Sequence, residues 1–169
     1  MMPDAIVPVP LTIRCQPILG LEWGSEKIDR KTRHKGIMAE MARVGREVFR
    51  IQDMISSQDN TNSGQALAAM IARIDTAIAK RKPDPMSFKI GITWNPPYRW
   101  ANTKYGYFHE GYSHMDILAW DFDARMIGLY ETSLINHYHE RHAKCLNVKL
   151  GDDNRQKVSP HFLYVTYRA

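Results

Sequence analysis

Residues 89–99 read Lys-Ile-Gly-Ile-Thr-Trp-Asn-Pro-Pro-Tyr-Arg, and the prediction of the fold starts from this stretch. From residue 87 to 93, apolar side chains alternate with polar or small ones, the period of two that is typical of a half-buried strand. Asn95 and the two prolines after it end the strand, and Asn95 can cap a short helix. Gly91 inside the strand indicates a bulge or a close approach of a ligand to the backbone. Read alone, Arg99 is a surface arginine that follows a core strand.

The chain after residue 86 alternates between strand and helix patterns. Residues 115–120 and 162–168 favour strands because they are rich in β-branched and aromatic side chains. Between them, Asp121 or Asp123 can cap a helix that runs to about Ala143. We therefore expect an α+β domain over residues 86–169, with a small three-stranded antiparallel sheet flanked by helices.

The first half of the chain predicts helices. Residues 1–24 contain four prolines and predict an extended arm. Residues 25–82 predict a helical hairpin that binds DNA or mediates dimerisation, because two apolar stripes recur at intervals of three and four residues. The stripes are Ile37, Met41, Val44, Val48, Ile51 and Ile55, then Leu67, Ile71, Ile74 and Ile78. Basic residues at 27–35 and 80–82 would meet at one end, as a solvated surface or as a contact for phosphates.

Composition sets limits on the function. The 169 residues are 44% hydrophobic and 24% charged, which suits one globular domain with an attachment, and the net charge of +5 favours an acidic partner such as nucleic acid. Two cysteines make no disulfide framework, and no apolar run approaches the roughly 18 residues of a membrane span. The first residues lack the pattern of a signal peptide. We expect a cytoplasmic protein without a membrane partner.

Glu131 is the most informative acidic residue. It shares one predicted helix face with Ile127, Leu134 and Ile135. A carboxylate within an apolar stripe is costly unless an arginine or a metal ion pairs with it. The alternative is that Glu131 lies at the edge of the stripe and reaches solvent.

Taken in order, these elements resemble the GIY-YIG nuclease family, in its branch with the pattern KIGxT. The resemblance covers about residues 87–151. The residues that carry it are Lys89-Ile90-Gly91, Thr93, Arg99 eight positions after the glycine, Glu131-x-x-Leu134-Ile135, and Leu146-Asn147.

The resemblance implies a metal-dependent endonuclease that hydrolyses DNA, with RNA not excluded. Glu131 would hold Mg²⁺ or another divalent cation, and Arg99 would bind the scissile phosphate. The general base stays open among Lys89, Tyr105 and Tyr107. The residues expected to bind substrate are Gly91, Thr93, Lys104 and Asn147.

The sequence departs from the family upstream of Phe88, where the first signature strand is missing. We hypothesise that residues 162–168 pair with 87–93 in its place, so that Tyr164 or Tyr167 enters the site, with Tyr167 as the catalytic candidate. If no strand replaces it, the chain is a catalytically inactive nucleic-acid-binding or assembly subunit. A separate hypothesis is that the hairpin or the arm supports a homodimer.

Two side-chain clusters have both a functional and a structural interpretation. His139, His142 and Cys145 recur every three residues, but three positions on one helix are a weak zinc signature, and exposed residues at a helix end are expected. The aromatic residues of 100–112 either stack on bases or cover the edge of the sheet.

Overall fold

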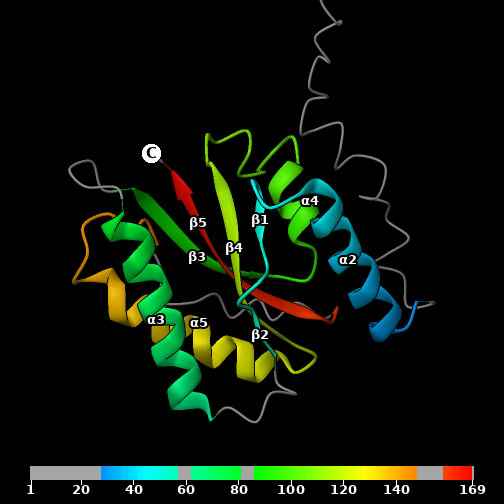
Figure 1. Ribbon diagram of the computed structural model, residues 1–169, viewed down its shortest axis with the longest axis horizontal. Helices are drawn as coiled ribbons and strands as arrows, with labels where there is room; N and C mark the ends of the chain where they lie inside the picture. Colours follow the sequence, from blue (N-terminus) through cyan, green and yellow to red (C-terminus); the bar gives the residue numbers. More distant parts are fainter. Residues whose placement is uncertain (1–27, 57–61, 81–85, 148–157, 169) are drawn as a thin grey trace, which may run out of the picture.

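A computed structural model describes residues 28–56, 62–80, 86–147 and 158–168 (Figure 1). The helices are α2 (Arg30–Val44), α3 (Ser63–Ala79), α4 (Pro96–Ala101) and α5 (Ala124–His139). The strands are β1 (Phe49–Arg50), β2 (Ile55–Ser56), β3 (Ser87–Thr93), β4 (His114–Asp121) and β5 (His161–Arg168). The predicted arm at 1–24 and the loop containing Gly151 lie outside the described residues.

All five strands form one mixed sheet. Its order is β1-β4-β5-β3, and β2 also pairs with β4. β5 is antiparallel to both β3 and β4, whereas β1 and β2 run parallel to β4. The α+β class is confirmed, but the sheet is mixed and has five strands instead of the three antiparallel strands predicted. The extra pair escaped prediction because two-residue strands leave no periodic pattern.

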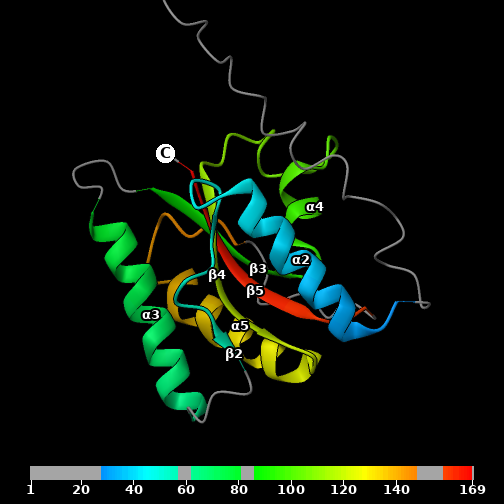
Figure 2. The ribbon, with the colours of Figure 1, turned by 45° about the vertical axis from the view of Figure 1, so that its right-hand side comes forward.

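Helices cover both faces of the sheet (Figures 1 and 2). α3 and α5 pack with one core cluster, which contains Phe88, Leu163 and Val165. α2, α4 and the loop after α4 pack with the other cluster, which contains Phe162 and Tyr164. Because alternate residues of a strand face opposite sides, β5 contributes to both clusters and is buried along almost its whole length.

The predicted helical hairpin is wrong. Its first helix ends at Val44, where Gly45 adopts a φ of 106° and closes the helix by donating its N–H to the Met41 carbonyl. Phe49 then pairs with Met115 of β4. As a result α2 and α3 lie on opposite faces of the sheet, and among the described residues the basic start of α2 does not meet Lys80 at the end of α3. The stripe that predicted one continuous helix crosses a turn and two short strands.

None of the helices in the described parts of the chain is long and apolar enough to cross a membrane.

Candidate functional site

Arg99 is held by a short helix whose start the sequence specifies. The Asn95 side chain accepts the N–H of Tyr98 at 3.1 Å, and prolines occupy the first helical positions. This cap fixes the direction of α4 as it leaves β3. Arg99 lies in its last turn.

The guanidinium of Arg99 lies among three tyrosines. Its carbon is 4.1 Å from the ring centroid of Tyr107 and 5.2 Å from that of Tyr105, and it donates a hydrogen bond to the Tyr105 carbonyl. The hydroxyls of Tyr107 and Tyr164 are 2.8 Å apart. Desolvation, the largest single cause, lowers the pKa of Arg99, but Tyr164, Tyr107 and Glu110 together raise it above its usual value. Arg99 is therefore a fixed cation.

Gly91 leaves room for Tyr164. The two residues are direct partners across β3 and β5, so they share one face of the sheet. A Cβ on Gly91 would lie 2.5 Å from the Tyr164 hydroxyl oxygen and 2.7 Å from the ring carbon that bears it. The sequence predicted a bulge or a close approach of a ligand at Gly91. In the structure the group that approaches Gly91 closely is the side chain of Tyr164.

Gly91→Ala should lower the free energy of unfolding by about 1–3 kcal/mol, because the fully buried Tyr164 cannot move away without repacking. Urea unfolding would measure the change. Gly128→Ala is the matched control: this helical position has nothing within 4 Å of an added Cβ, so the variant should gain about 0.5–1 kcal/mol. Equal stability of Gly91→Ala and the parent would contradict the assigned contact.

The hypothesis about residues 162–168 is confirmed in its first part. β5 pairs with β3 along the whole strand, and Tyr164 reaches Arg99. Tyr167, however, was the wrong choice, because its ring packs with the cluster on the other face and stacks on His114 at 4.9 Å. Burial, the largest cause, raises the pKa of both tyrosines, so neither acts as a base near neutral pH.

The structure does not bring Glu131 to Arg99. Glu131 is 8% exposed and lies on the buried face of α5, which packs against the side of the sheet opposite α4. The partners of Arg99 are Tyr105, Tyr107, Tyr164 and Glu110. An ion held by Glu131 would therefore not share a phosphate with Arg99, and these residues do not fit the single-ion site that the resemblance implies.

The remaining predicted site residues are placed as follows. Lys89 is half-buried on the same face of β3 as Gly91, and the buried Thr93 hydroxyl accepts the N–H of Asn95 at 3.2 Å. Lys104 and Tyr105 are exposed in the loop after α4, with Tyr105 46% exposed. A hydrogen bond with Tyr98, the largest cause, raises the pKa of Tyr105, which disfavours Tyr105 as a base.

Asn147 has a structural role. Its side chain accepts the N–H of Ile90 at 3.0 Å and donates to the Ile90 carbonyl at 2.8 Å. The backbone of 144–146 also pairs with Phe88. This segment therefore covers the outer edge of β3, an edge that would otherwise leave backbone groups unpaired. Asn147 was expected to bind substrate; in the structure its amide binds the backbone of Ile90 instead.

No three His, Cys, Asp or Glu side chains in the described ranges are arranged to hold a metal ion, and this includes His139, His142 and Cys145. Burial, the largest cause, raises the pKa of the Cys145 thiol. We therefore keep the interpretation of His139, His142 and Cys145 as ordinary polar residues at a helix end, in preference to a zinc site.

A basic pocket is the feature that the sequence did not predict. It lies between α2, β1, α3 and β4 and contains Arg46, Arg50, Arg73 and Lys80. Arg73 donates to Asp116 at 2.7 Å and to the Ile117 carbonyl at 3.1 Å. No local pattern indicates this group, since its members come together only through the register that pairs Arg50 with Asp116.

The chain matches no known family model, no curated protein and no solved structure.

Proposed function

We propose that the protein binds nucleic acid through Arg99 and the aromatic loop that follows α4. The observation that supports this most directly is the position of Arg99, a fixed cation next to the exposed ring of Tyr105. Single-stranded nucleic acids are bound by this combination, in which cations contact phosphates and aromatic rings stack on bases. Lys104, exposed in the same loop, adds positive charge.

We prefer binding without cleavage because Glu131 and Arg99, the two residues expected to act together in catalysis, are separated by the sheet. The endonuclease implied by the resemblance needs a carboxylate and an arginine at one phosphate. Here Glu131 and Arg99 project on opposite sides of the sheet. The chain then corresponds to the inactive nucleic-acid-binding alternative.

One observation favours hydrolysis as a second candidate function. β5 pairs with β3, where the resemblance would require the missing signature strand, and Tyr164 of β5 lies next to Arg99 and against Gly91. In a hydrolase of the kind that the resemblance implies, a tyrosine at this place would orient the attacking water, and Lys89 stays a candidate base.

Fluorescence anisotropy with labelled single-stranded DNA, single-stranded RNA and duplex DNA tests the binding. Arg99→Gln and Tyr105→Ala should each weaken binding to a single strand by about 5- to 100-fold, the loss typical of one stacking or phosphate contact. Affinity should fall with added salt because phosphate contacts release counterions. Arg141→Gln, at an exposed position beyond α5, should leave binding unchanged. Unaltered affinity in Arg99→Gln that keeps the parent melting temperature would contradict the proposal.

Cleavage of plasmid DNA with Mg²⁺ separates the two candidate functions. The binding proposal expects intact plasmid with the parent protein. Cutting by the parent that is lost in both Glu131→Gln and Arg99→Gln would overturn it in favour of hydrolysis.

A further inference from the structure

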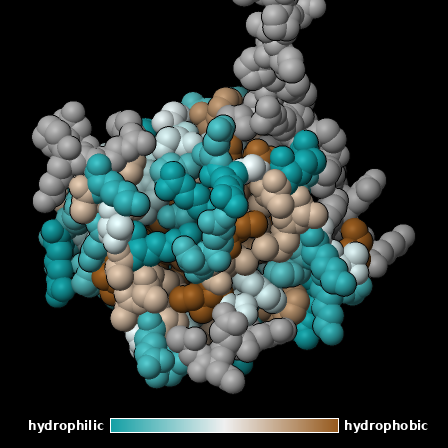
Figure 3. All heavy atoms as spheres, viewed as in Figure 1, coloured by the Kyte–Doolittle hydropathy of each residue, from teal (hydrophilic) through white to brown (hydrophobic). Residues whose placement is uncertain are grey.

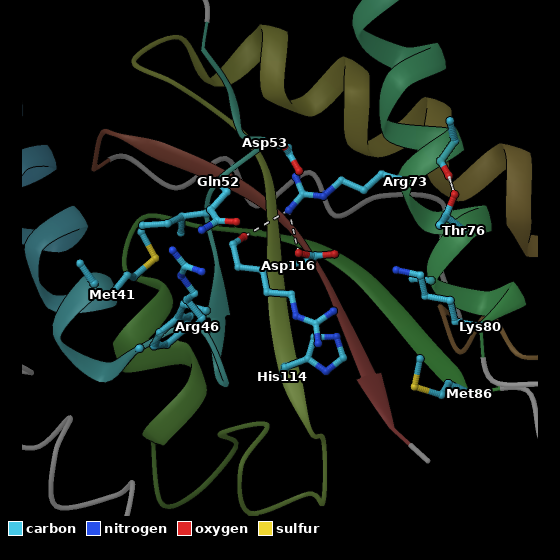
Figure 4. Close-up of a pocket in the computed structure, with 17 residues that line it drawn as sticks. Met41, Arg46, Gln52, Asp53, Arg73, Thr76, Lys80, Met86, His114 and Asp116 are labelled. Atoms are coloured by element: carbon cyan, nitrogen blue, oxygen red, sulfur yellow. Dashed lines mark hydrogen bonds and ion pairs between the residues drawn. The ribbon is translucent and has the colours of Figure 1, made fainter.

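The basic pocket is a cavity of about 920 Å³ at the edge of the sheet where β1 lies, and it is separate from the site around Arg99. Figure 4 shows its side chains converging from α2, α3, β1 and β4. Figure 3 shows hydrophilic residues gathered on this face of the molecule. Neither Arg99 nor any residue of the loop 102–112 lines it.

Positive charge predominates in the pocket. The lining contains four cationic side chains, Arg46, Arg50, Arg73 and Lys80, and two carboxylates, Asp53 and Asp116. The Arg73–Asp116 ion pair neutralises one charge of each sign. The remaining cations outnumber the remaining carboxylate by three to one.

The four cations differ in the hydrogen bonds and ion pairs that they make within the protein. Arg73 is hydrogen-bonded to β4, and the Arg46 guanidinium donates to the Gln52 side-chain oxygen at 2.8 and 3.0 Å. Within the described parts of the chain, no hydrogen bond or ion pair is made by the ammonium of Lys80 or the guanidinium of Arg50, although the charge of Arg50 also acts on Asp116. Figure 4 shows the Lys80 amine directed into the pocket. These two cations are available to an anionic ligand.

The rest of the lining suits a ligand that is only partly ionic. Met41, Phe49, Met86 and Ala77 supply apolar wall. The volume lies within the range of about 300–1,000 Å³ that small-molecule sites occupy. A wall made from four separate elements also suits a molecule of limited length better than a polymer, which needs a continuous groove.

We propose that this pocket binds a phosphate-bearing small molecule of nucleotide size, of the nucleoside diphosphate class. Lys80 and Arg50 contact the phosphate groups, as charge-assisted hydrogen bonds favour. The apolar wall contacts the base, and the carboxylate of Asp53 accepts hydrogen bonds from the sugar. This ligand goes beyond the proposed nucleic-acid binding, because it uses different residues.

Isothermal titration of the full chain with ADP, adenosine and inorganic phosphate tests the proposal. ADP should bind and adenosine should give no measurable heat, since the phosphates supply the ionic contacts. Inorganic phosphate should compete with ADP, a result that depends on no variant. Lys80→Gln and Arg50→Gln should each weaken ADP binding at least fivefold, and the double variant should abolish it. Both positions are exposed, so the variants should keep the parent melting temperature.

Lys35→Gln is the matched control, because Lys35 is an exposed lysine on α2 outside the pocket. It should leave ADP binding unchanged, and Arg99→Gln should do so too. Three results would overturn the proposal: no heat with ADP or phosphate, an unchanged affinity in the double variant, or adenosine binding as tightly as ADP. Displacement of ADP by a single-stranded oligonucleotide of higher affinity, together with loss of direct oligonucleotide binding in the double variant, would assign the pocket to a nucleic-acid backbone instead.

Discussion

Arg73→Met should lower the free energy of unfolding by about 3–5 kcal/mol, the range for breaking one side of a buried ion pair. Asp116 is 4% exposed, and once Arg73 is gone it has lost its ion-pair partner and retains only the coulombic effect of Arg50. Arg73 also donates to the carbonyls of Ile117 and Arg50, so it attaches α3 to the β1–β4 pair. Urea unfolding at pH 7.5 would measure the loss.

The loss of unfolding free energy in Arg73→Met should depend on pH, because the Asp116 carboxyl is buried and its protonation state changes the cost of burial. Burial, the largest cause, raises the pKa of Asp116, and Arg73 opposes that rise. Without Arg73 the folded-state pKa rises further above its unfolded value. The cost of the buried charge is therefore present above the folded-state pKa and is relieved as the pH falls through it.

The deficit of Arg73→Met should accordingly be smaller at about pH 5 than at pH 7.5. Arg73→Met with Asp116→Leu should recover stability, because no uncompensated charge remains. Arg125→Met, which breaks the exposed pair with Asp123, should change nothing measurable. A deficit that is the same at both pH values and persists in the double variant would show that packing, and not the buried carboxylate, explains the effect.

Gly106→Ala should destabilise the fold by about 3 kcal/mol or more and should disturb the Arg99 site. An added Cβ would lie 2.6 Å from the Trp100 carbonyl oxygen and 2.6 Å from the Asn102 nitrogen, both backbone atoms that cannot rotate away. The loop after α4 folds back here, and Phe108 donates its N–H to the Trp100 carbonyl at 3.0 Å. A shift would therefore displace Tyr105 and Tyr107 from Arg99.

Two measurements check this prediction. The melting temperature should fall well below that of Gly128→Ala, the control at an open helical position. Affinity for single-stranded DNA, measured where the variant is still folded, should fall toward that of Arg99→Gln. A variant with parent stability would show that the loop has room at residue 106.

The second half of the chain was predictable because its patterns are local. The alternation at 87–93 and the aromatic run at 162–168 each correspond to one strand, and Asn95 caps α4 as expected. The pairing of β5 with β3 was hypothesised because the resemblance implies a strand beside residues 87–93 that is missing upstream, and the structure contains this pairing. Glu131 was also correctly placed on the buried face of its helix.

What failed depends on contacts between distant residues. The stripe through Ile51 and Ile55 has helical spacing, but Gly45 ends the helix, and Ile55 lies in β2, where it pairs with Ala119 of β4. Tyr164 and Tyr167 look alike in sequence, yet they face opposite sides of the sheet, and only the register decides which one meets Arg99. Arg73 and Asp116 are 43 positions apart, and no local pattern connects them.

The central place of β5 has a consequence for how the protein is made. β3 and β4 are joined through β5 and not to each other, yet β5 is synthesised after both. During translation, the apolar side chains of β3, β4 and their helices are therefore not yet covered by the strand that links them. The sheet can close only after residues 161–168 leave the ribosome, and contacts between segments so far apart in sequence form slowly. A chaperone that shields exposed strand edges would have its main opportunity in that interval.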